Sequence, residues 1–247
     1  MENENFSDDE IKSLEKISDE YLKPDPGRIV DKKLFSMISD EVLPWIEGPE
    51  VLEMGFGDDE WTSKIINKIG HSNVVDASSI LLKTSKEKYK EKIRTYESLF
   101  EFFKPDKSFD TILASYILEH VENPVLVLKN ASEWLTPTGK LIAIVPHAGS
   151  LHRRLAVAMG LQPNVSDLGV TDQRMGHRRV YTIDTFENDL TKAGYKIEMK
   201  TGFFTKLLPQ AMMHNMSDEM LKGLMNLSHQ LPIEYAASIA FVCRLKR

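Results

Sequence analysis

The amino-acid sequence predicts an α/β fold in which helices cover both faces of a doubly wound, mostly parallel sheet. Short apolar segments alternate with amphipathic helical segments along the chain, which is the order of elements in β-α-β units. One apolar segment runs into a Gly-x-Gly turn that opens a helix. The composition is 42% hydrophobic and 28% charged, which suits a globular protein with a sizeable core. We therefore expect a single domain over residues 1–247.

The first 48 residues predict a helical segment ahead of the sheet. Ser7 is placed to cap a helix over 7–23, because a glutamate follows three residues later and an apolar stripe runs along the segment. The proline- and glycine-containing stretch 24–27 ends this helix. A second helix is expected over 29–43, since a proline follows it directly.

Residues 49–146 carry the alternation from which the parallel sheet is predicted. The expected strands are short and apolar and cover 51–54, 72–76, 93–96, 109–115 and 140–145. The expected helices cover 59–69, 79–91 and the stretch from the end of the fourth strand through Trp134. Residues 136–139 read Thr-Pro-Thr-Gly, and we expect a turn there.

Residues 147–247 complete the sheet but interrupt its rhythm twice. A helix over 183–193 and a strand over 195–201 continue the pattern, and a last strand is expected over 237–244. The irregular stretches 147–181 and 203–231 are expected to be insertions that form a cap on the substrate side. The second stretch is rich in methionine, which favours packing in the core or the cap over a homodimer contact, although that contact stays an alternative.

Composition disfavours several classes of protein. The formal net charge is −6, whereas a protein that wraps nucleic acid usually needs a basic surface. Cys243 is the single cysteine, so no intrachain disulfide forms, and no Cys/His spacing predicts a zinc site. No apolar run has the roughly 20 residues that span a bilayer, and the polar start lacks the features of a signal peptide. We expect a cytoplasmic protein without a metal and with neither a nucleic acid nor a membrane as partner.

The Gly-x-Gly turn belongs to the segment VLEMGFGD, residues 51–58. Glu53 precedes the two glycines, and the position of a third glycine in a dinucleotide site is Glu60. Asp58 and Asp59 at the helix start oppose a pyrophosphate, so a ligand with positive charge and no phosphate is favoured. Asp76 follows the second glycine by about 20 residues, the spacing of a carboxylate that binds ribose hydroxyls. The alternative is an ordinary turn in which Asp76 caps the next helix.

Four segments in order resemble the class I S-adenosylmethionine-dependent methyltransferases: VLEMGFG, VVDAS, FDTILASYILEHVENP and WLTPTGKLIAIVP. The resemblance covers about residues 49–146. It implies a Rossmann-like, seven-stranded sheet whose last strand is antiparallel, and it implies S-adenosyl-L-methionine as the cofactor. The departure is Asp58, where many members carry a third glycine.

The resemblance also implies which residues hold the cofactor. The first motif would hold its amino-acid part, the acid after the second strand its ribose, the residues after the third strand its adenine, and the end of the fourth strand its methionine end. The implied positions are Glu53, Gly55, Phe56, Gly57, Asp76, Ala77, Ser78, Ser98, Leu99, Ser115 and His120. For His120, a structural histidine that bonds the backbone is an equal alternative.

Two basic segments, SLHRR within 146–154 and GHRRVY at 176–181, predict the acceptor side. They hold four arginines and three histidines, and arginine pairs with carboxylate or phosphate-type groups. We expect a small anionic acceptor and O-methylation; both segments also resemble a bacterial subgroup, some members of which O-methylate small acidic or phosphonate compounds. The expected acceptor residues are Tyr21, His147, His152, Arg153, Arg154, His177, Arg178, Arg179 and Tyr181. The alternative is that these arginines form surface pairs.

Other functions stay open on the sequence. A small-molecule N-methyltransferase acting on an amine or an amino sugar is the main alternative, and a non-catalytic cofactor-binding subunit is a remote one. The missing third glycine disfavours an NAD-dependent oxidoreductase. A nucleic-acid base methyltransferase is disfavoured because 115–118 reads Ser-Tyr-Ile-Leu, not the Asn/Asp-Pro-Pro-Tyr type. No catalytic base is assigned.

Overall fold

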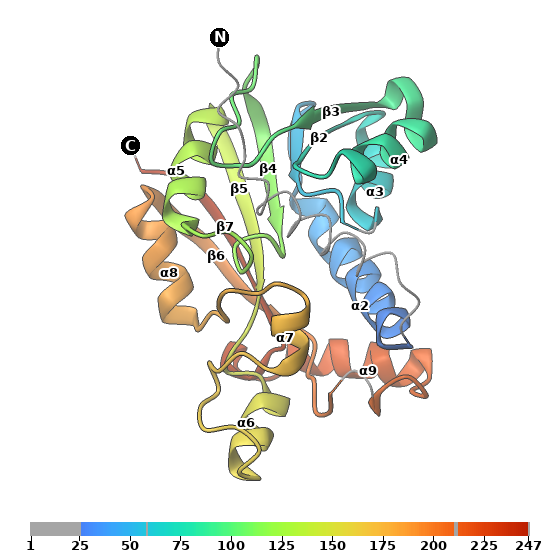
Figure 1. Ribbon diagram of the computed structural model, residues 1–247, viewed down its shortest axis with the longest axis vertical. Helices are drawn as coiled ribbons and strands as arrows, with labels where there is room; N and C mark the ends of the chain where they lie inside the picture. Colours follow the sequence, from blue (N-terminus) through green and yellow to red (C-terminus); the bar gives the residue numbers. More distant parts are fainter. Residues whose placement is uncertain (1–25, 58, 210–211, 247) are drawn as a thin grey trace.

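A central seven-stranded sheet forms the body of the computed structural model, which describes residues 26–57, 59–209 and 212–246 (Figure 1). The strand order is β3-β2-β1-β4-β5-β7-β6. β7 is antiparallel to both of its neighbours, and the other pairs are parallel. The strands are β1 (Val51–Met54), β2 (Ser72–Asp76), β3 (Ile93–Glu97), β4 (Phe109–Ser115), β5 (Leu135–Pro146), β6 (Tyr195–Phe203) and β7 (Ser238–Leu245). This confirms the predicted seven-stranded sheet with an antiparallel last strand.

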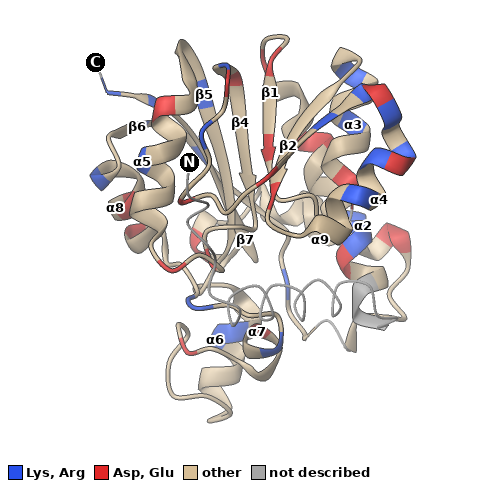
Figure 2. Cartoon of the chain, turned by 45° about the horizontal axis from the view of Figure 1, so that its top comes forward, with Lys and Arg blue, Asp and Glu red and all other residues tan. Residues whose placement is uncertain are grey.

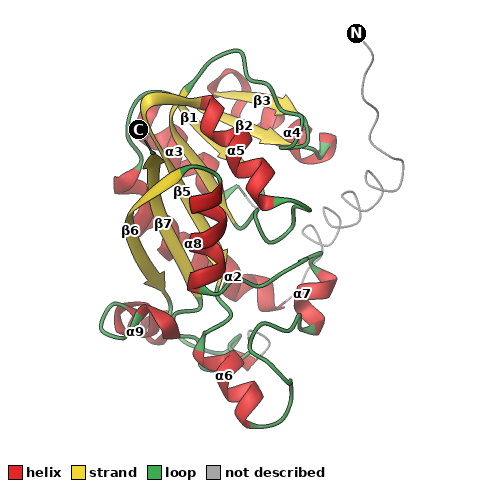
Figure 3. Ribbon diagram, turned by 90° about the vertical axis from the view of Figure 1, so that its left-hand side faces the viewer, coloured by secondary structure: helices red, strands yellow, loops and turns green. Residues whose placement is uncertain are grey.

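Helices lie on both faces of the sheet (Figures 1 and 3). The α-helices among the described residues are α2 (Pro26–Val42), α3 (Glu60–Ile69), α4 (Ser79–Tyr89), α5 (Pro124–Trp134), α6 (Leu151–Ala158), α7 (Val170–Arg174), α8 (Ile183–Lys192) and α9 (Asp218–Ser228). One core joins α5 and α8 to the sheet, and a second core joins α2, α3 and α9 to the opposite face. A smaller core packs α4 on β2 and β3.

The central strands are buried on both faces, which explains their nearly continuous apolar sequences. In β4, Ile112 and Ala114 face the core under α5 and α8, while Leu113 between them faces the core under α2 and α3. Leu141 and Ile142 of β5 divide between the two cores in the same way. A strand with two buried faces shows no polar alternation, so its run of apolar residues is the usable signal.

Two local expectations are wrong. The expected turn at 136–139 is part of β5, because the pairing of β4 with β5 shifts its register: Phe109 pairs with Leu135, and Thr111 pairs with Lys140. The irregularity takes up the extra residues of the Thr-Pro-Thr-Gly stretch. Gly139 is needed there, since a Cβ would lie 2.8 Å from the Phe109 carbonyl oxygen.

The helix expected directly after β4 begins eight residues late. Residues 116–123 form a loop, and α5 starts only at Pro124, whose fixed φ suits the first helical position. Asn123 caps the helix, because its side chain accepts a hydrogen bond of 3.0 Å from the Leu126 amide. The loop, rather than a helix, therefore follows the carboxyl end of β4.

The expected cap lies beyond the carboxyl ends of the parallel strands, where α6, α7 and α9 gather (Figures 1 and 3). Met213 and Met225 of the methionine-rich stretch are buried against α2, whereas Met212 and Met220 are exposed. The expected first helix over 7–23 lies outside the described residues. None of the helices described within 26–246 combines the length and apolar character needed to cross a bilayer.

Candidate functional site

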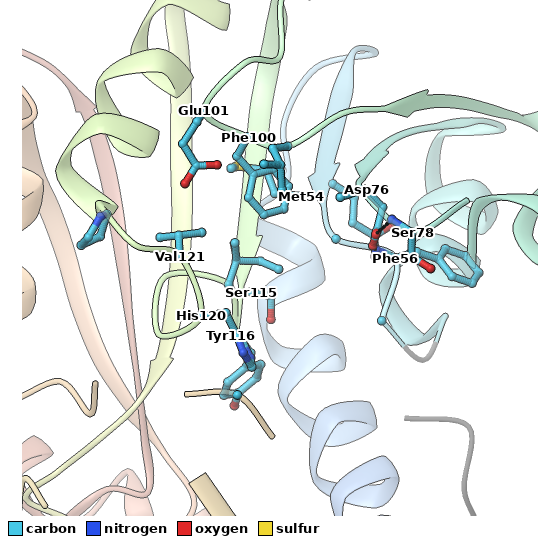
Figure 4. Close-up of a pocket in the computed structure, with 18 of the residues that line it drawn as sticks. Met54, Phe56, Asp76, Ser78, Phe100, Glu101, Ser115, Tyr116, His120 and Val121 are labelled. Atoms are coloured by element: carbon cyan, nitrogen blue, oxygen red, sulfur yellow. Dashed lines mark hydrogen bonds between the residues drawn. The ribbon is translucent and has the colours of Figure 1, made fainter. Parts of the chain in front are cut away.

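A cavity of about 890 Å³ opens at the carboxyl edge of the sheet (Figure 4). The turns after β1, β2 and β3, the loop after β4 and residues 176–178 form its wall. Its volume is that of a pocket for a ligand of cofactor size. All the positions implied for the cofactor line it: Glu53, Gly55, Phe56, Gly57, Asp76, Ala77, Ser78, Ser98, Leu99, Ser115 and His120.

The turn between β1 and α3 brings bare backbone to the cavity. Gly55 and Gly57 both have a positive φ, at 81° and 54°, which glycine adopts without strain. A Cβ added at Gly57 would meet nothing within 4 Å, so the main chain there lies open to a ligand. A Cβ at Gly55 would lie 2.5 Å from the Ile117 Cδ1 atom. The turn therefore fits a ligand that approaches the backbone closely.

Asp76 joins the first two turns. Its carboxylate accepts hydrogen bonds from the amides of Phe56 (2.8 Å) and Ser78 (2.7 Å), one on each oxygen. Burial raises the pKa of Asp76, and these backbone hydrogen bonds oppose that shift. The cap of α4 is Ser78, whose hydroxyl accepts from the Leu81 amide at 3.3 Å. Each carboxylate oxygen keeps acceptor capacity for a hydroxyl such as that of a ribose.

The wall of the cavity is acidic. Glu53 is buried, and its carboxylate accepts the hydroxyl hydrogen of Thr62. Asp76, Glu101 and Glu122 also line the wall, where Arg178 is the only Lys or Arg among the described residues. Such a wall favours a cationic ligand over a phosphate.

Asp59 lies directly before α3, where its charge was expected to oppose a pyrophosphate. Its carboxylate forms an ion pair with Lys88 and accepts the hydroxyl hydrogen of Tyr89, both on α4. It thereby ties the turn after β1 to α4. Asp58 lies outside the described residues.

Several residues of the wall had no sequence signal. Trp61, in the first turn of α3, donates from Nε1 to the Ser115 Oγ at 3.0 Å and so fixes the end of β4. Tyr116 has a φ of +57°, rare for a large residue, and its hydroxyl donates to Ser238 at 2.8 Å. The Phe35 ring of α2 lies 4.8 Å from the Tyr116 ring. Of these residues, only Trp61 could have been proposed from the sequence, because it lies in the first turn of the helix that follows the glycine turn.

Of the residues expected to bind the acceptor, His177 and Arg178 line the cavity. The His177 ring meets the His120 ring edge-on, with centroids 4.7 Å apart. Arg178 donates from Nε to the His120 carbonyl at 3.1 Å. Tyr21 lies outside the described residues.

The other expected acceptor residues are absent from the cavity wall and have protein partners. His147 is buried with its Nδ1 atom 3.0 Å from the Ala236 carbonyl. The remaining contacts are His152 with Ser150, Arg153 with Asp172, Arg154 with the Gly149 carbonyl and the Tyr235 ring, and Tyr181 with Asp189. Figure 2 shows basic segments on α6, beyond the carboxyl edge of the sheet. These side chains join cap elements to one another and to the sheet.

Arg179 stabilises the loop after β4. Its guanidinium donates to the carbonyls of Leu118 (2.7 Å), Val121 (2.5 Å) and Glu122 (2.9 Å). The planar fork of arginine is suited to several acceptors at once. Because the same loop carries His120 and Val121 into the cavity, Arg179 supports the wall without being part of it.

We expect Arg179→Met to lower stability by about 1–3 kcal/mol, because it leaves loop carbonyls without donors. Thermal and urea unfolding measure this effect. Lys129→Met, an exposed site on α5, serves as the control and is expected to unfold as the native chain does. An Arg179→Met protein with native stability and a raised KM for the acceptor would return Arg179 to the acceptor residues and contradict the supporting role.

Residues 21–200 match the methyltransferase domain family, which is more than half of the chain. No curated protein matches the chain significantly. The resemblance of SLHRR and GHRRVY to a bacterial subgroup therefore stays a prediction.

Solved structures share the fold at low sequence identity. The N-methyltransferase NodS from Bradyrhizobium japonicum WM9, in complex with S-adenosyl-L-homocysteine, is 14% identical with a TM-score of 0.60 over 95% of this chain and 98% of that one. A S-adenosylmethionine-dependent methyltransferase from Clostridium acetobutylicum ATCC 824 is 13% identical with a TM-score of 0.58, over 87% and 92%. The glycopeptide N-methyltransferase MtfA, complexed with S-adenosyl-L-methionine, is 14% identical with a TM-score of 0.57, over 86% and 87%.

The family match and the fold agree with the arrangement of the site. A glycine turn, the carboxylate of Asp76 and an acidic wall meet at the carboxyl edge of a seven-stranded sheet. This chain belongs to the methyltransferase domain family and has the fold of the S-adenosylmethionine-dependent methyltransferases.

Proposed function

We propose that this chain, an S-adenosylmethionine-dependent methyltransferase, methylates an oxygen atom of a small anionic acceptor. The observation that carries the proposal is one continuous cavity, which has the glycine turn and Asp76 on one side and His120, His177 and Arg178 on the other. Figure 4 displays this separation for Asp76 and His120. One side suits the cofactor, and the other leaves room for an acceptor.

The proposed cofactor contacts follow the chemistry of each group. Open backbone at Gly57 and the carboxylate of Glu53 would hold the amino-acid part, and Asp76 would accept hydrogen bonds from the ribose hydroxyls. Ser98 and Leu99, with the neighbouring Phe100, would flank the adenine. When bound, S-adenosylmethionine supplies a methyl group on a positively charged sulfur. The acidic wall favours that charge.

The chain's own residues would orient the acceptor and exclude water. Burial lowers the pKa of His120 to about 3, so its imidazole is neutral at pH 7 and offers a lone pair. A carboxylate or phosphonate acceptor needs no base, whereas a hydroxyl acceptor must lose its proton. Alignment of the acceptor oxygen is the main contribution expected of the protein.

Few residues of the cavity support the proposal that the acceptor is an anion. Arg178 and the two histidines face the cavity, whereas Arg153, Arg154 and Arg179 have protein partners elsewhere. Arg178 is exposed, and the hydrogen bond from its Nε to the His120 carbonyl holds its guanidinium at the cavity.

N-methylation of a small amine is the second candidate, and a specific observation favours it. Glu101 and Glu122 line the cavity, and their carboxylates would attract an ammonium group. NodS and MtfA, which share the fold, are named N-methyltransferases.

Incubation with methyl-labelled S-adenosylmethionine tests the function. The expected result is label in at least one member of a set of small carboxylates, phosphonates and phenols, with mass spectrometry locating the methyl group on oxygen. Label confined to an amine set would replace the proposal by the second candidate. Cofactor binding without label in any set would favour a non-catalytic subunit.

A further inference from the structure

Three potential metal ligands lie close together: His120 and His177 line the cavity, and the buried Glu119 lies beside them. Glu119 and His120 lie in the loop after β4, and His177 follows α7. One ligand atom from each lies within 4.8 Å of the others. Ligands of one ion at about 2.1 Å stand roughly 3–4 Å apart, so side-chain movements of about 1 Å would bring the three into coordination.

The surroundings of Glu119 are the main evidence for a bound ion. Its side chain is 0% exposed, and neither carboxylate oxygen has a hydrogen-bond partner among the described residues. A buried carboxylate without a partner costs several kcal/mol. Protonation leaves the problem in place, since a neutral carboxyl group also needs partners. A bound cation would satisfy both oxygens at once.

The surroundings orient both histidines. The Nδ1 atom of His177 lies 3.1 Å from the Asp172 carboxylate, which itself forms an ion pair with Arg153. The His120 ring packs edge-on against the His177 ring. A neutral imidazole that donates through one nitrogen keeps the other as a ligand atom. A carboxylate partner such as Asp172 is a usual support of a metal-binding histidine.

The backbone fixes the two loops to each other. The Arg178 amide donates to the Glu119 carbonyl at 2.8 Å, and the His177 amide donates to the Asp172 carbonyl at 2.9 Å. Arg179 also holds the loop after β4 through its carbonyls. The basic segment GHRRVY thus places His177 against Glu119 and His120, which gives its neighbouring arginines a structural reason.

We propose that Glu119, His120 and His177 bind a divalent cation of the Mn²⁺ or Zn²⁺ type, which holds an oxygen atom of the acceptor. Two imidazoles and one carboxylate suit Zn²⁺, and can also hold Mn²⁺, better than Ca²⁺, which prefers oxygen ligands alone. Three protein ligands leave positions open for the acceptor. A dipositive ion with one carboxylate has a net charge of +1, which provides the attraction for an anion that the distant arginines lack.

The acceptor role of this ion rests on the proposed function, but its binding does not. Isothermal titration of the chelator-treated full chain with MnCl₂ or ZnCl₂, without cofactor or acceptor, is expected to show one equivalent bound. Glu119→Gln and His177→Asn are each expected to weaken binding at least 10-fold. Glu122→Gln, which alters a carboxylate of the same cavity outside the cluster, is expected to bind the ion as the native chain does.

Thermal unfolding separates a ligand role from a structural one. Without metal, Glu119→Gln is expected to have a Tm no lower than that of the native chain, because it removes a buried charge. With metal, only the native chain and Glu122→Gln are expected to gain stability. If Glu119→Gln does not fold, His177→Asn carries the test.

The outcomes distinguish the metal site from the proposed function. No saturable metal binding by the native chain, or native affinity in both Glu119→Gln and His177→Asn, would overturn the metal site. S-adenosylhomocysteine is titrated into the same metal-free sample. Cofactor binding without metal binding would leave the function standing alone, and metal binding without cofactor binding would leave the metal site standing alone.

Discussion

Asp76→Ala is expected to weaken the binding of S-adenosylhomocysteine by about 100-fold. The carboxylate is proposed to accept hydrogen bonds from two ribose hydroxyls. Each hydrogen bond to a charged group contributes about 1.5–3 kcal/mol. A loss of about 1.4 kcal/mol in binding free energy weakens affinity tenfold. The same carboxylate accepts the Phe56 and Ser78 amides. Its removal therefore also loosens the two turns that form the cradle. Isothermal titration of the purified variant measures the affinity.

Glu97→Ala is the matched control for this prediction. Glu97 ends β3 and is the register partner of Asp76 in the neighbouring strand, but it is exposed and outside the cavity wall. It is expected to bind the cofactor product normally. Asp76→Asn, which keeps the shape of the side chain, distinguishes loss of charge from collapse of the turns. Native affinity in Asp76→Ala would remove Asp76 from the cofactor site.

Phe186→Ala is expected to destabilise the fold by about 3–5 kcal/mol, as large core truncations do. The ring is 0% exposed and lies between Tyr181 and Phe241, with centroid distances of 5.3 Å and 4.7 Å. It joins α8 to the sheet, so its removal leaves a cavity lined by aromatic rings. The midpoint of urea unfolding, taken with the slope m, measures the loss.

Phe102→Ala provides the comparison for Phe186→Ala. The Phe102 side chain is 53% exposed at the rim of the cofactor cavity. Without ligand its truncation is expected to change the unfolding free energy by less than about 1 kcal/mol. Equal losses in the two variants would mean that the core between α8 and the sheet is not as closely packed as the ring contacts indicate.

The prediction of the sheet succeeded because its signals are local. Apolar runs such as the one at 109–115 have the composition and length of strands buried on both faces, and the glycines at 55 and 57 adopt positive φ values. Asp76 was predicted to bind the cofactor from its spacing along the chain from that turn. Each of these features depends on residues close together in the chain or on a spacing fixed by one β-α-β unit.

Of the residues predicted for the acceptor, only His177 and Arg178 line the cavity, because an arginine or a histidine can serve several roles. The same arginine can bind a ligand or a set of backbone carbonyls, and Arg179 takes the carbonyls. The prediction of a turn at 136–139 was wrong for a similar reason, because its proline and glycine lie within β5, where the pairing with β4 shifts its register. Residue type gave the donors, and the packing of distant segments selected their acceptors.

Glu119 could not be identified as a site residue from local sequence patterns. In the sequence it is an ordinary glutamate in the middle of the loop after β4, and His177 lies 58 positions later. Only the folded chain buries that carboxylate without a hydrogen-bond partner beside two imidazoles.

The sequence alone determined the order of the strands and of helices α2 to α5 and α8, the glycine turn and the acid that follows it, because backbone preferences and periodicity act over a few residues. The tertiary structure alone decided which basic side chains face the cavity and which hold the cap together. That choice depends on contacts between segments that are far apart in the chain, where many pairings satisfy the same local pattern and only close packing selects one.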